Sequence, residues 1–226
     1  MLLIAHRGYH AATPENTLAA FEAAIMVGAG GIETDVRICR DGVPVLIHDR
    51  IIASGKAVAD LTRRELNQAV GYEIPTLDEA LECFPGVLWN VEIKTLQALS
   101  TVIRVLEKHQ AGHRLVVTSF RHDLVAVCAS LLKVNCGLLL AHRPLTLNSL
   151  LADFNCNVIP RINHVVWNYE VLDDILLKQA ASDGYRNVVY GDVTLAYALQ
   201  KISDRNDAVS VIAKNALNLL RENHAT

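Results

Sequence analysis

The segment Ile4–Asp49 decides the fold, and its informative pieces read IAHRG (4–8), TPENT (13–17), GIETDV (31–36) and DGVPVLIHD (41–49). Three short apolar runs within it end in polar pairs, which are His6-Arg7, Glu33 with Asp35, and His48-Asp49. Parallel barrels carry their catalytic groups at the C-terminal ends of their strands. The pattern therefore indicates a parallel barrel whose polar pairs meet at one mouth.

The first three elements read as a strand, a helix and a second strand. Leu2–Ala5 is a continuous apolar run, as expected for a strand that is buried on both faces. Thr13-Pro14 predicts the start of a helix with Thr13 as its cap, and the glycines of 28–31 end that helix. With a second strand at 32–36, the unit spans about 35 residues and fits a right-handed crossover.

The connection after the second strand, residues 37–44, is too short for a parallel crossover, which needs about a dozen residues or more. It contains Asp41-Gly42, a typical hairpin signal. We therefore predict that 43–48 returns antiparallel to the second strand and lies outside the barrel count. With Asp41 and Gly42 as the two turn residues, Asp35 pairs with His48 and the two side chains face each other.

The remaining chain supplies six further barrel strands and the helices between them. We predict strands at 87–93, 115–119, 136–140, 158–162, 187–190 and 208–213, in addition to those at 2–6 and 32–36. We predict helices at 77–84, 96–109, 122–133, 144–153, 170–182, 193–203 and 215–223. The fold class is therefore α/β, a (β/α)8 TIM barrel that forms a single domain over residues 1–226.

Residues of about 37–75 are predicted to form a small insertion over the barrel mouth, directly after the second strand. Thr62 with Glu65 and Thr76 with Glu79 form two capping-box patterns. The first predicts a short helix within the insertion, and the second opens the helix that follows it.

Composition limits the classes of function. With 51% hydrophobic residues the chain can bury a large core, and its net charge of −3 without a basic stripe argues against a nucleic-acid partner. No run approaches the roughly 20 apolar residues of a membrane span. Met1–Ala5 is too short for a signal-peptide core, so we expect a cytoplasmic protein. The five cysteines lack CxxC spacing, which favours reduced, mostly buried thiols over a zinc site.

Three carboxylates are expected to converge at the barrel mouth. Glu33 and Asp35 are two positions apart on a strand and point to one face, and Glu92 ends the neighbouring strand. Such an all-oxygen cluster suits Mg²⁺ or Ca²⁺ better than zinc, because buried carboxylates are costly unless they are paired or metal-bound. The alternative is a network of salt bridges with Arg7, Arg37 or Lys94.

His6 and His48 come from separate elements, yet both are expected at the same mouth. Histidine side chains can serve as a general base and a general acid near neutral pH. Such a pair can activate an attacking hydroxyl and protonate a leaving alkoxide. The alternative is a structural role, which we expect for the other histidines: His10, His109, His113, His122, His142, His164 and His224.

Seven short motifs follow one another along the chain: His6-Arg7-Gly8, Pro14-Glu15-Asn16-Thr17, Glu33-Thr34-Asp35, Asp41-Gly42, His48-Asp49, Glu92-Ile93-Lys94 and Ser119-Phe120. In this order they resemble the glycerophosphodiester phosphodiesterase family. The resemblance is dense from residue 1 to about 120 and thin after it. It implies a metal-dependent hydrolase that acts on glycerophosphodiesters, which are small molecules of lipid and glycerol metabolism.

The resemblance also implies roles for individual residues. Seven residues of this chain match residues that act directly in the family. They are the metal ligands Glu33, Asp35 and Glu92, the catalytic pair His6 and His48, and the phosphate-binding Arg7 and Lys94. Asn16 matches a residue that supports the first loop, with helix-start geometry as the alternative. Asp49 is expected to orient a histidine or the loop beneath it. Ser119 and Phe120 are expected to line the pocket, with plain packing as the alternative for the serine.

The last third of the chain departs from the family pattern. The family usually carries Trp-Thr-Val-Asn on its seventh strand, where this chain reads Val189-Tyr190-Gly191-Asp192. It usually ends an apolar run with Thr-Asp-x-Pro, where this chain continues from Ala213 into Lys214-Asn215. These positions meet the alcohol or head group, so the sequence determines the reaction class better than the substrate.

The leading hypothesis is metal-dependent hydrolysis of a glycerophosphodiester to glycerol 3-phosphate and an alcohol. A second hypothesis keeps the machinery but uses a lysophospholipid or another phosphodiester, with a substrate hydroxyl attacking first to give a cyclic phosphate. A third is a non-catalytic phosphate-binding barrel, which only the altered C-terminal third supports. The intact pair of His6 and His48 argues against it, because binding alone does not require two acid–base groups.

Overall fold

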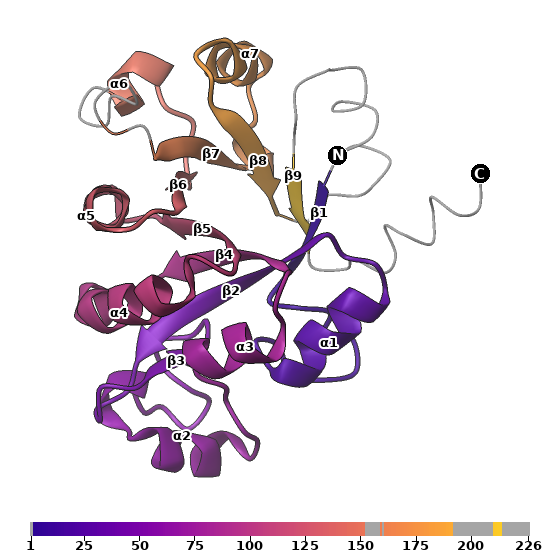
Figure 1. Cartoon of the computed structure of the whole chain (residues 1–226), viewed down its shortest axis with the longest axis vertical. Coiled ribbons are helices and arrows are strands. Elements are labelled where there is room, and N and C mark those ends of the chain that lie inside the picture. The colour runs from indigo at the N-terminus through magenta and orange to yellow at the C-terminus, as the bar shows by residue number, and fades with distance from the viewer. Residues whose placement is uncertain (1, 152–158, 160, 192–209, 214–226) are drawn as a thin grey trace.

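The computed structural model describes residues 2–151, 159, 161–191 and 210–213, and these residues contain a ring of eight parallel strands (Figure 1). The strands are β1 (Leu2–His6), β2 (Gly31–Ile38), β4 (Leu88–Ile93), β5 (Arg114–Ser119), β6 (Asn135–Leu140), β7 (Ile162–Asn168), β8 (Arg186–Tyr190) and β9 (Ser210–Ala213). Each pairs in parallel with the next strand of this series, and β9 pairs with β1. The predicted TIM barrel is confirmed.

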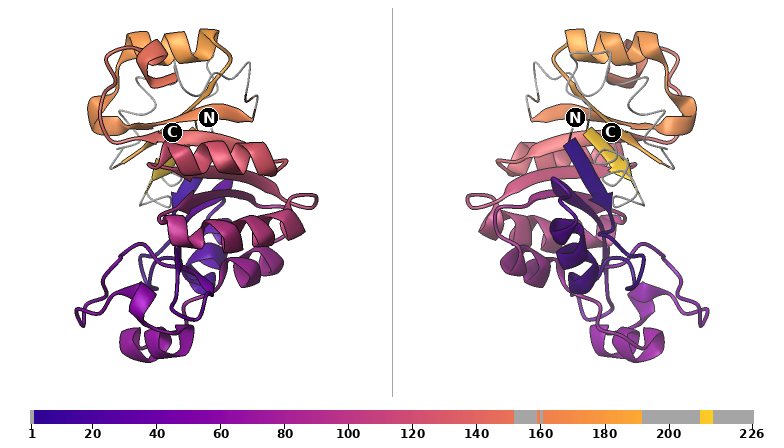
Figure 2. Two further views of the ribbon diagram at one scale, coloured as in Figure 1. Left: turned by 90° about the vertical axis from the view of Figure 1, so that its left-hand side faces the viewer. Right: turned by 90° about the vertical axis from the view of Figure 1, so that its right-hand side faces the viewer.

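The helices cover the outside of this ring, except for the one at 63–70, which lies away from it (Figures 1 and 2). They are α1 (Leu18–Met26), α2 (Arg63–Val70), α3 (Leu77–Cys83), α4 (Leu99–His109), α5 (His122–Leu131), α6 (Leu147–Leu151) and α7 (Asp174–Ser182), with 3-10 helices η1 (Val58–Asp60), η2 (Leu96–Ala98) and η3 (Tyr169–Val171). The helices predicted at 193–203 and 215–223 lie outside the described residues. Within the described part of the chain, no helix has the length and apolar character needed to cross a bilayer.

The main apolar core lies between the strands and these helices. Phe21 of α1 packs edge-on against Trp89 of β4, with ring centroids 5.1 Å apart, and both side chains are fully buried. Leu106 of α4 and Leu124 of α5 belong to the same buried cluster. The apolar strands therefore pack against the helices, as expected for a parallel sheet that is covered on both faces.

β3 (Pro44–Leu46) runs antiparallel to β2 as predicted, but in a different register. The Ile47 N–H donates to the Asp35 carbonyl at 3.0 Å, so the predicted pairing of Asp35 with His48 is wrong by one residue. A two-residue hairpin turn of the Asp-Gly type needs positive φ at both positions. Only Gly42 has a positive φ, at +77°, and Asp41 does not. The Cys39 N–H donates to the Val43 carbonyl, so the loop contains the three residues 40–42 and ends on a glycine in the left-handed conformation.

α1 begins at Leu18, later than the helix predicted to open at Thr13-Pro14. The side chain of Thr17, and not that of Thr13, caps it by accepting a hydrogen bond from the Ala20 N–H at 3.2 Å. Asn16 lies just before the cap with a φ of +56°, which no α-helix contains. The turn at Asn16 therefore delays the helix and keeps the first loop over the barrel end.

The strand predicted at 158–162 is wrong. β7 begins at Ile162 and extends to Asn168, while residues 152–158 and 160 lie outside the described part of the chain. A polar pair, Asn163 and His164, follows Ile162 directly, and His164 is nevertheless buried. This polar pair concealed the apolar run that follows it.

Residues between β2 and α3 form a small unit with its own apolar cluster. It includes β3, η1 and α2, and the buried members of its cluster are Cys39, Val45, Ile52, Val58, Leu61, Leu66 and Ile74. Both predicted capping boxes are present, at Thr62 with Glu65 and at Thr76 with Glu79. This unit therefore has local stabilisation that is separate from the barrel core.

Candidate active site

Strand pairing brings the predicted carboxylates to one end of the barrel. In the observed register His6 of β1 lies beside Glu33 of β2, and Asp35 of β2 lies beside Glu92 of β4. All three carboxylate residues are buried, with no more than 7% of any of them exposed. One oxygen from each lies within 4.8 Å of the others, so the three predicted ligands converge on one point.

Two cationic side chains contact this cluster. Lys94 Nζ lies 2.9 Å from Asp35 Oδ1 and 2.5 Å from Glu92 Oε1. Arg7 Nε lies 3.1 Å from Asp35 Oδ2, and Arg7 Nη1 donates to Glu15 at 2.8 Å. The salt-bridge network considered from the sequence therefore exists around Asp35. Arg37, the third cation considered there, instead donates to the His48 carbonyl at 2.7 Å.

Without a bound metal, the cluster disfavours ionisation of two of its three carboxylates. Burial raises the pKa of Glu33 well above its usual range, and the charges of Asp35 and Glu92 raise it further. Burial also raises the pKa of Glu92, against the charge of Lys94. Burial acts in the same direction on Asp35, but Lys94 and Arg7 outweigh it and lower the pKa. Three buried carboxylates with two cations fit a hard divalent cation bound through oxygen.

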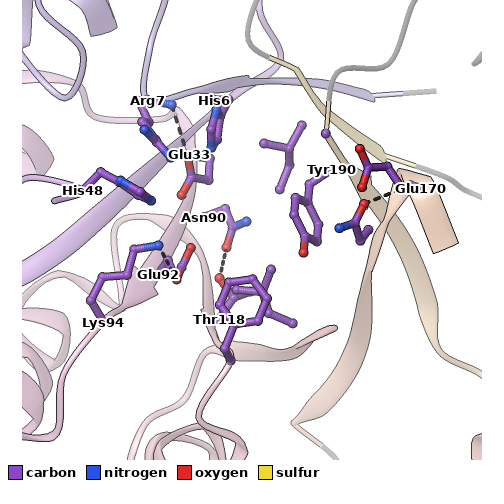
Figure 3. Close-up of a pocket in the computed structure, with 15 residues that line it drawn as sticks. His6, Arg7, Glu33, His48, Asn90, Glu92, Lys94, Thr118, Glu170 and Tyr190 are labelled. Atoms are coloured by element: carbon purple, nitrogen blue, oxygen red, sulfur yellow. Dashed lines mark hydrogen bonds and ion pairs between the residues drawn. The ribbon is translucent and has the colours of Figure 1, made fainter. Parts of the chain in front are cut away.

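His6 and His48 line the same cavity, which measures about 300 Å³ (Figure 3). His6 Nε2 lies 3.8 Å from Glu33 Oε2, at the edge of the carboxylate cluster. His48 Nδ1 lies 2.8 Å from Asp49 Oδ1, so the exposed Asp49 carboxylate fixes the ring orientation, as expected. Although the Asp35–His48 pairing is wrong, the antiparallel return still carries His48 to the cavity.

Asn16 connects the first loop to the floor of the site. Its Nδ2 donates to Asp35 Oδ2 at 3.0 Å, and its Oδ1 accepts from Thr34 Oγ1 at 2.7 Å. The Asn16 N–H donates to the Arg7 carbonyl, and Arg7 itself has a φ of +59°. Two residues with left-handed backbone therefore hold each other in place, and the buried amide of Asn16 is bonded to a carboxylate of the cluster.

Ser119 lies behind the cavity and does not line it. The buried Ser119 Oγ donates to the Ile93 carbonyl at 2.7 Å and accepts from the Arg121 N–H at 3.1 Å. It therefore ties the end of β5 to the end of β4, which is the packing alternative. Its neighbour Phe120 does line the cavity, with Lys94 Nζ 5.9 Å from the centroid of its ring.

The cavity also contains polar residues that the sequence did not single out: Asn90, Thr118, Asn168 and Glu170. Asn90 lies two positions before Glu92 on β4, and its Oδ1 accepts from Thr118 Oγ1 at 2.8 Å. The alternation of side chains along a strand could have identified Asn90 as inward-facing. Glu170 could not be found in this way, because it follows the strand whose position was predicted wrongly.

Comparison with known families gives a match to the glycerophosphoryl diester phosphodiesterase family over residues 6–101. A probable glycerophosphodiester phosphodiesterase 2 of Mycobacterium tuberculosis is 38% identical over 127 residues, covering 53% of this chain and 48% of the relative. A glycerophosphodiester phosphodiesterase of Caldanaerobacter subterraneus subsp. tengcongensis is 35% identical over 142 residues, covering 54% of this chain and 58% of the relative. The chain thus matches about half the length of these curated relatives.

Solved structures of phosphodiesterases are similar to this chain over nearly its full length. A glycerophosphodiester phosphodiesterase from Thermotoga maritima has a TM-score of 0.83 at 26% identity, covering 98% of this chain and 97% of the other. A phosphodiesterase from Oleispira antarctica, solved with its product sn-glycerol-3-phosphate, has a TM-score of 0.84 at 22% identity, covering 100% and 97%. These similarities extend the shared fold beyond residues 6–101.

Proposed function

We propose that the chain is a metal-dependent phosphodiester hydrolase of the glycerophosphodiester phosphodiesterase family, on the premise of the match over residues 6–101 and of the curated relatives. It cleaves glycerophosphodiesters to glycerol 3-phosphate and an alcohol. The observation that carries the proposal is one cavity that gathers two histidines, three converging carboxylates and two cations. Phosphate binding alone requires the cations but not the two acid–base groups.

In the proposed reaction His6 and His48 move the protons. One takes a proton from the attacking water as its oxygen forms the new bond to phosphorus, and the other protonates the alcohol oxygen as its bond to phosphorus breaks. Asp49 holds the His48 ring through Nδ1 and leaves Nε2 for the substrate. Glu33, Asp35 and Glu92 would hold a divalent cation, which would stabilise the charge that builds on the phosphoryl oxygens.

Lys94 and Arg7 bind the phosphoryl oxygens in this proposal. The Lys94 ammonium has three N–H donors, and its contacts with Asp35 and Glu92 account for two of them. The Arg7 guanidinium contacts carboxylates through Nε and Nη1, and we assign Nη2 to the phosphate. Both cations therefore balance the carboxylates and attract the substrate at once.

The chain organisation fits this division of roles. We propose one barrel domain over residues 1–226, in which the insertion of about 37–75 covers the mouth. Its separate apolar cluster supports this assignment. The barrel strands carry His6 and the three carboxylates, whereas the insertion carries His48.

The test is hydrolysis by the purified protein of glycerophosphoglycerol, glycerophosphocholine and glycerophosphoethanolamine, followed by phosphorus NMR. We expect glycerol 3-phosphate from at least one diester with Mg²⁺ or Ca²⁺, and loss of turnover in EDTA that returns when metal is added back. A cyclic phosphate would instead identify attack by a substrate hydroxyl. No phosphorus product from any diester, with either metal, would contradict the proposed function.

A further inference from the structure

The two sides of the active-site cavity differ in chemistry. One side, the polar wall, consists of His6, Arg7, Glu33, His48, Glu92 and Lys94. Five further lining residues, here named the far wall, are Phe120, Leu139, Glu170, Tyr190 and Ile212. Figure 3 shows Tyr190 and Glu170 across the cavity from His48 and Lys94. A diester whose phosphate lies at the polar wall can direct one of its alcohol arms toward the far wall.

Two aromatic rings lead from one wall to the other. The Phe120 ring lies 5.9 Å from Lys94 Nζ on one side and packs edge-on to the Tyr190 ring at 6.1 Å on the other. Tyr190 Oη donates to the Leu140 carbonyl at 3.0 Å, which fixes its ring. Phe120 remains 44% exposed. An alcohol arm that leaves the phosphate therefore passes along rigid aromatic surface.

Glu170 places a carboxylate at the end of this aromatic surface. It lies in η3, and its N–H donates to the Asn168 side chain at 2.9 Å, which fixes the backbone of this turn. In the described part of the chain no Lys, Arg or His nitrogen forms an ion pair with Glu170. Unlike the carboxylates of the polar wall, Glu170 is exposed and its charge is available to a ligand.

We propose that the far wall selects glycerophosphodiesters whose alcohol carries an ammonium or quaternary ammonium group. Aromatic rings and a carboxylate together attract an organic cation, whereas a neutral polyol gains little from either. Such a substrate is a zwitterion, with its phosphate at Lys94 and Arg7 and its cation at Glu170, Tyr190 and Phe120. The cavity of about 300 Å³ is at the small end of small-molecule sites, which suits a small diester. The inference rests on the proposed function, whose site it extends.

The experiment compares kcat/KM for glycerophosphocholine, glycerophosphoethanolamine and the neutral glycerophosphoglycerol. We expect the wild-type protein to prefer the two cationic diesters about tenfold, the effect of roughly 1.4 kcal/mol of differential binding. E170Q should lower the ratio of choline to glycerol diester about three- to tenfold, mainly through KM for the choline diester. E170K should lower it further, because it replaces attraction by repulsion.

Glu107 provides the matched control, since it is an exposed glutamate on α4 that does not line the cavity. E107Q should keep the wild-type ratio. Equal kcat/KM for all three diesters in the wild type, or an unchanged ratio in E170Q and E170K, would overturn the inference while leaving the proposed function intact. If no diester is hydrolysed, the proposed function fails, and calorimetry with glycerophosphocholine decides instead. Equal affinity in wild type and E170Q would then overturn the inference.

Discussion

Two neighbouring carboxylates of the cluster, those of Glu33 and Asp35, have opposite electrostatic environments. Glu33 and Asp35 point to the same face of β2, and both are buried. Asp35 contacts Lys94, Arg7 and the amide of Asn16, whereas Glu33 accepts a hydrogen bond from the Arg7 backbone N–H at 3.1 Å. Ionised Asp35 is therefore stabilised by the protein, and ionised Glu33 is not.

This difference predicts opposite effects on the metal-free protein. D35N should destabilise it by about 3 to 5 kcal/mol, because Lys94 and Arg7 lose their common partner. E33Q should leave the free energy of unfolding unchanged or higher, because it removes a charge that burial disfavours. Urea unfolding in EDTA measures both, and calorimetry should show weaker Mg²⁺ or Ca²⁺ binding in each variant. Equal destabilisation by the two changes would show that Glu33 is as well paired as Asp35.

The proposed acid and base are also tested at the scale of the residue. H6A and H48A should each lower turnover about 10² to 10⁴-fold, the usual worth of a positioned proton-transfer group. A nitrophenyl diester needs little protonation of its leaving group, so it should rescue the variant that lacks the acid and not the one that lacks the base. H142A, at an exposed position, is the control. Wild-type turnover in both H6A and H48A would exclude the two-histidine mechanism.

At the scale of the element, the hairpin after β2 determines where His48 lies. The sequence predicted its antiparallel direction from the short connection, but the wrong loop length shifted the register by one residue. The choice between a two- and a three-residue loop depends on backbone φ at Asp41 and Gly42, which composition does not reveal. Asn16 is a similar case, since its left-handed backbone and its bonds to Asp35 and Thr34 displace the start of α1.

The left-handed Gly42 gives a prediction for this hairpin. G42A should destabilise the protein by about 1 kcal/mol or slightly more, because a Cβ is disfavoured at a φ of +77°. Nothing lies within 4 Å of the added Cβ, so the cost is conformational and not steric. G112A is the matched control, since Gly112 also has open space but no positive φ. Denaturation midpoints that move equally in the two variants would argue against a strained loop.

At the scale of the whole molecule, the sequence predicted the barrel and the convergence of its first strands, but not the far wall. Apolar runs ending in polar pairs located β1, β2 and β4, because the C-terminal ends of parallel strands share one rim. β7 escaped this reasoning since Asn163 and His164 interrupt its apolar run directly after Ile162. With the end of β7 misplaced, Glu170 could not be assigned to the cavity. The polar start of that strand thus concealed a part of the candidate site.

His164 makes the stability of the whole fold depend on pH. Burial, with the charge of Arg186, lowers its pKa from 6.5 to about 4. Between these values the unfolded chain binds a proton that the folded chain does not, so stability is lost as pH falls from 6.5 to about 4. The slope should be at most about 1.4 kcal/mol per pH unit, and the total loss about 3 kcal/mol.

Urea unfolding at several pH values measures this effect. H164N should have a flatter dependence than the wild type between pH 6.5 and 4, because its side chain takes up no proton. H142N changes an exposed histidine and should keep the wild-type slope. Parallel curves for H164N and the wild type would assign the acid sensitivity to other groups.

The separate apolar cluster beneath His48 has a consequence for how the protein adapts to temperature. The barrel strands that carry His6 pack in one core, and most of the segment that carries His48 packs in another, although Leu46 of β3 belongs to the barrel core. Loosening of the second core alone would separate His48 from the groups on the barrel strands while the first core stays intact. The working temperature and the melting temperature are then set by different residues. Natural selection can adjust the former through side chains such as Ile52, Leu61 and Leu66, while the barrel itself remains as it is.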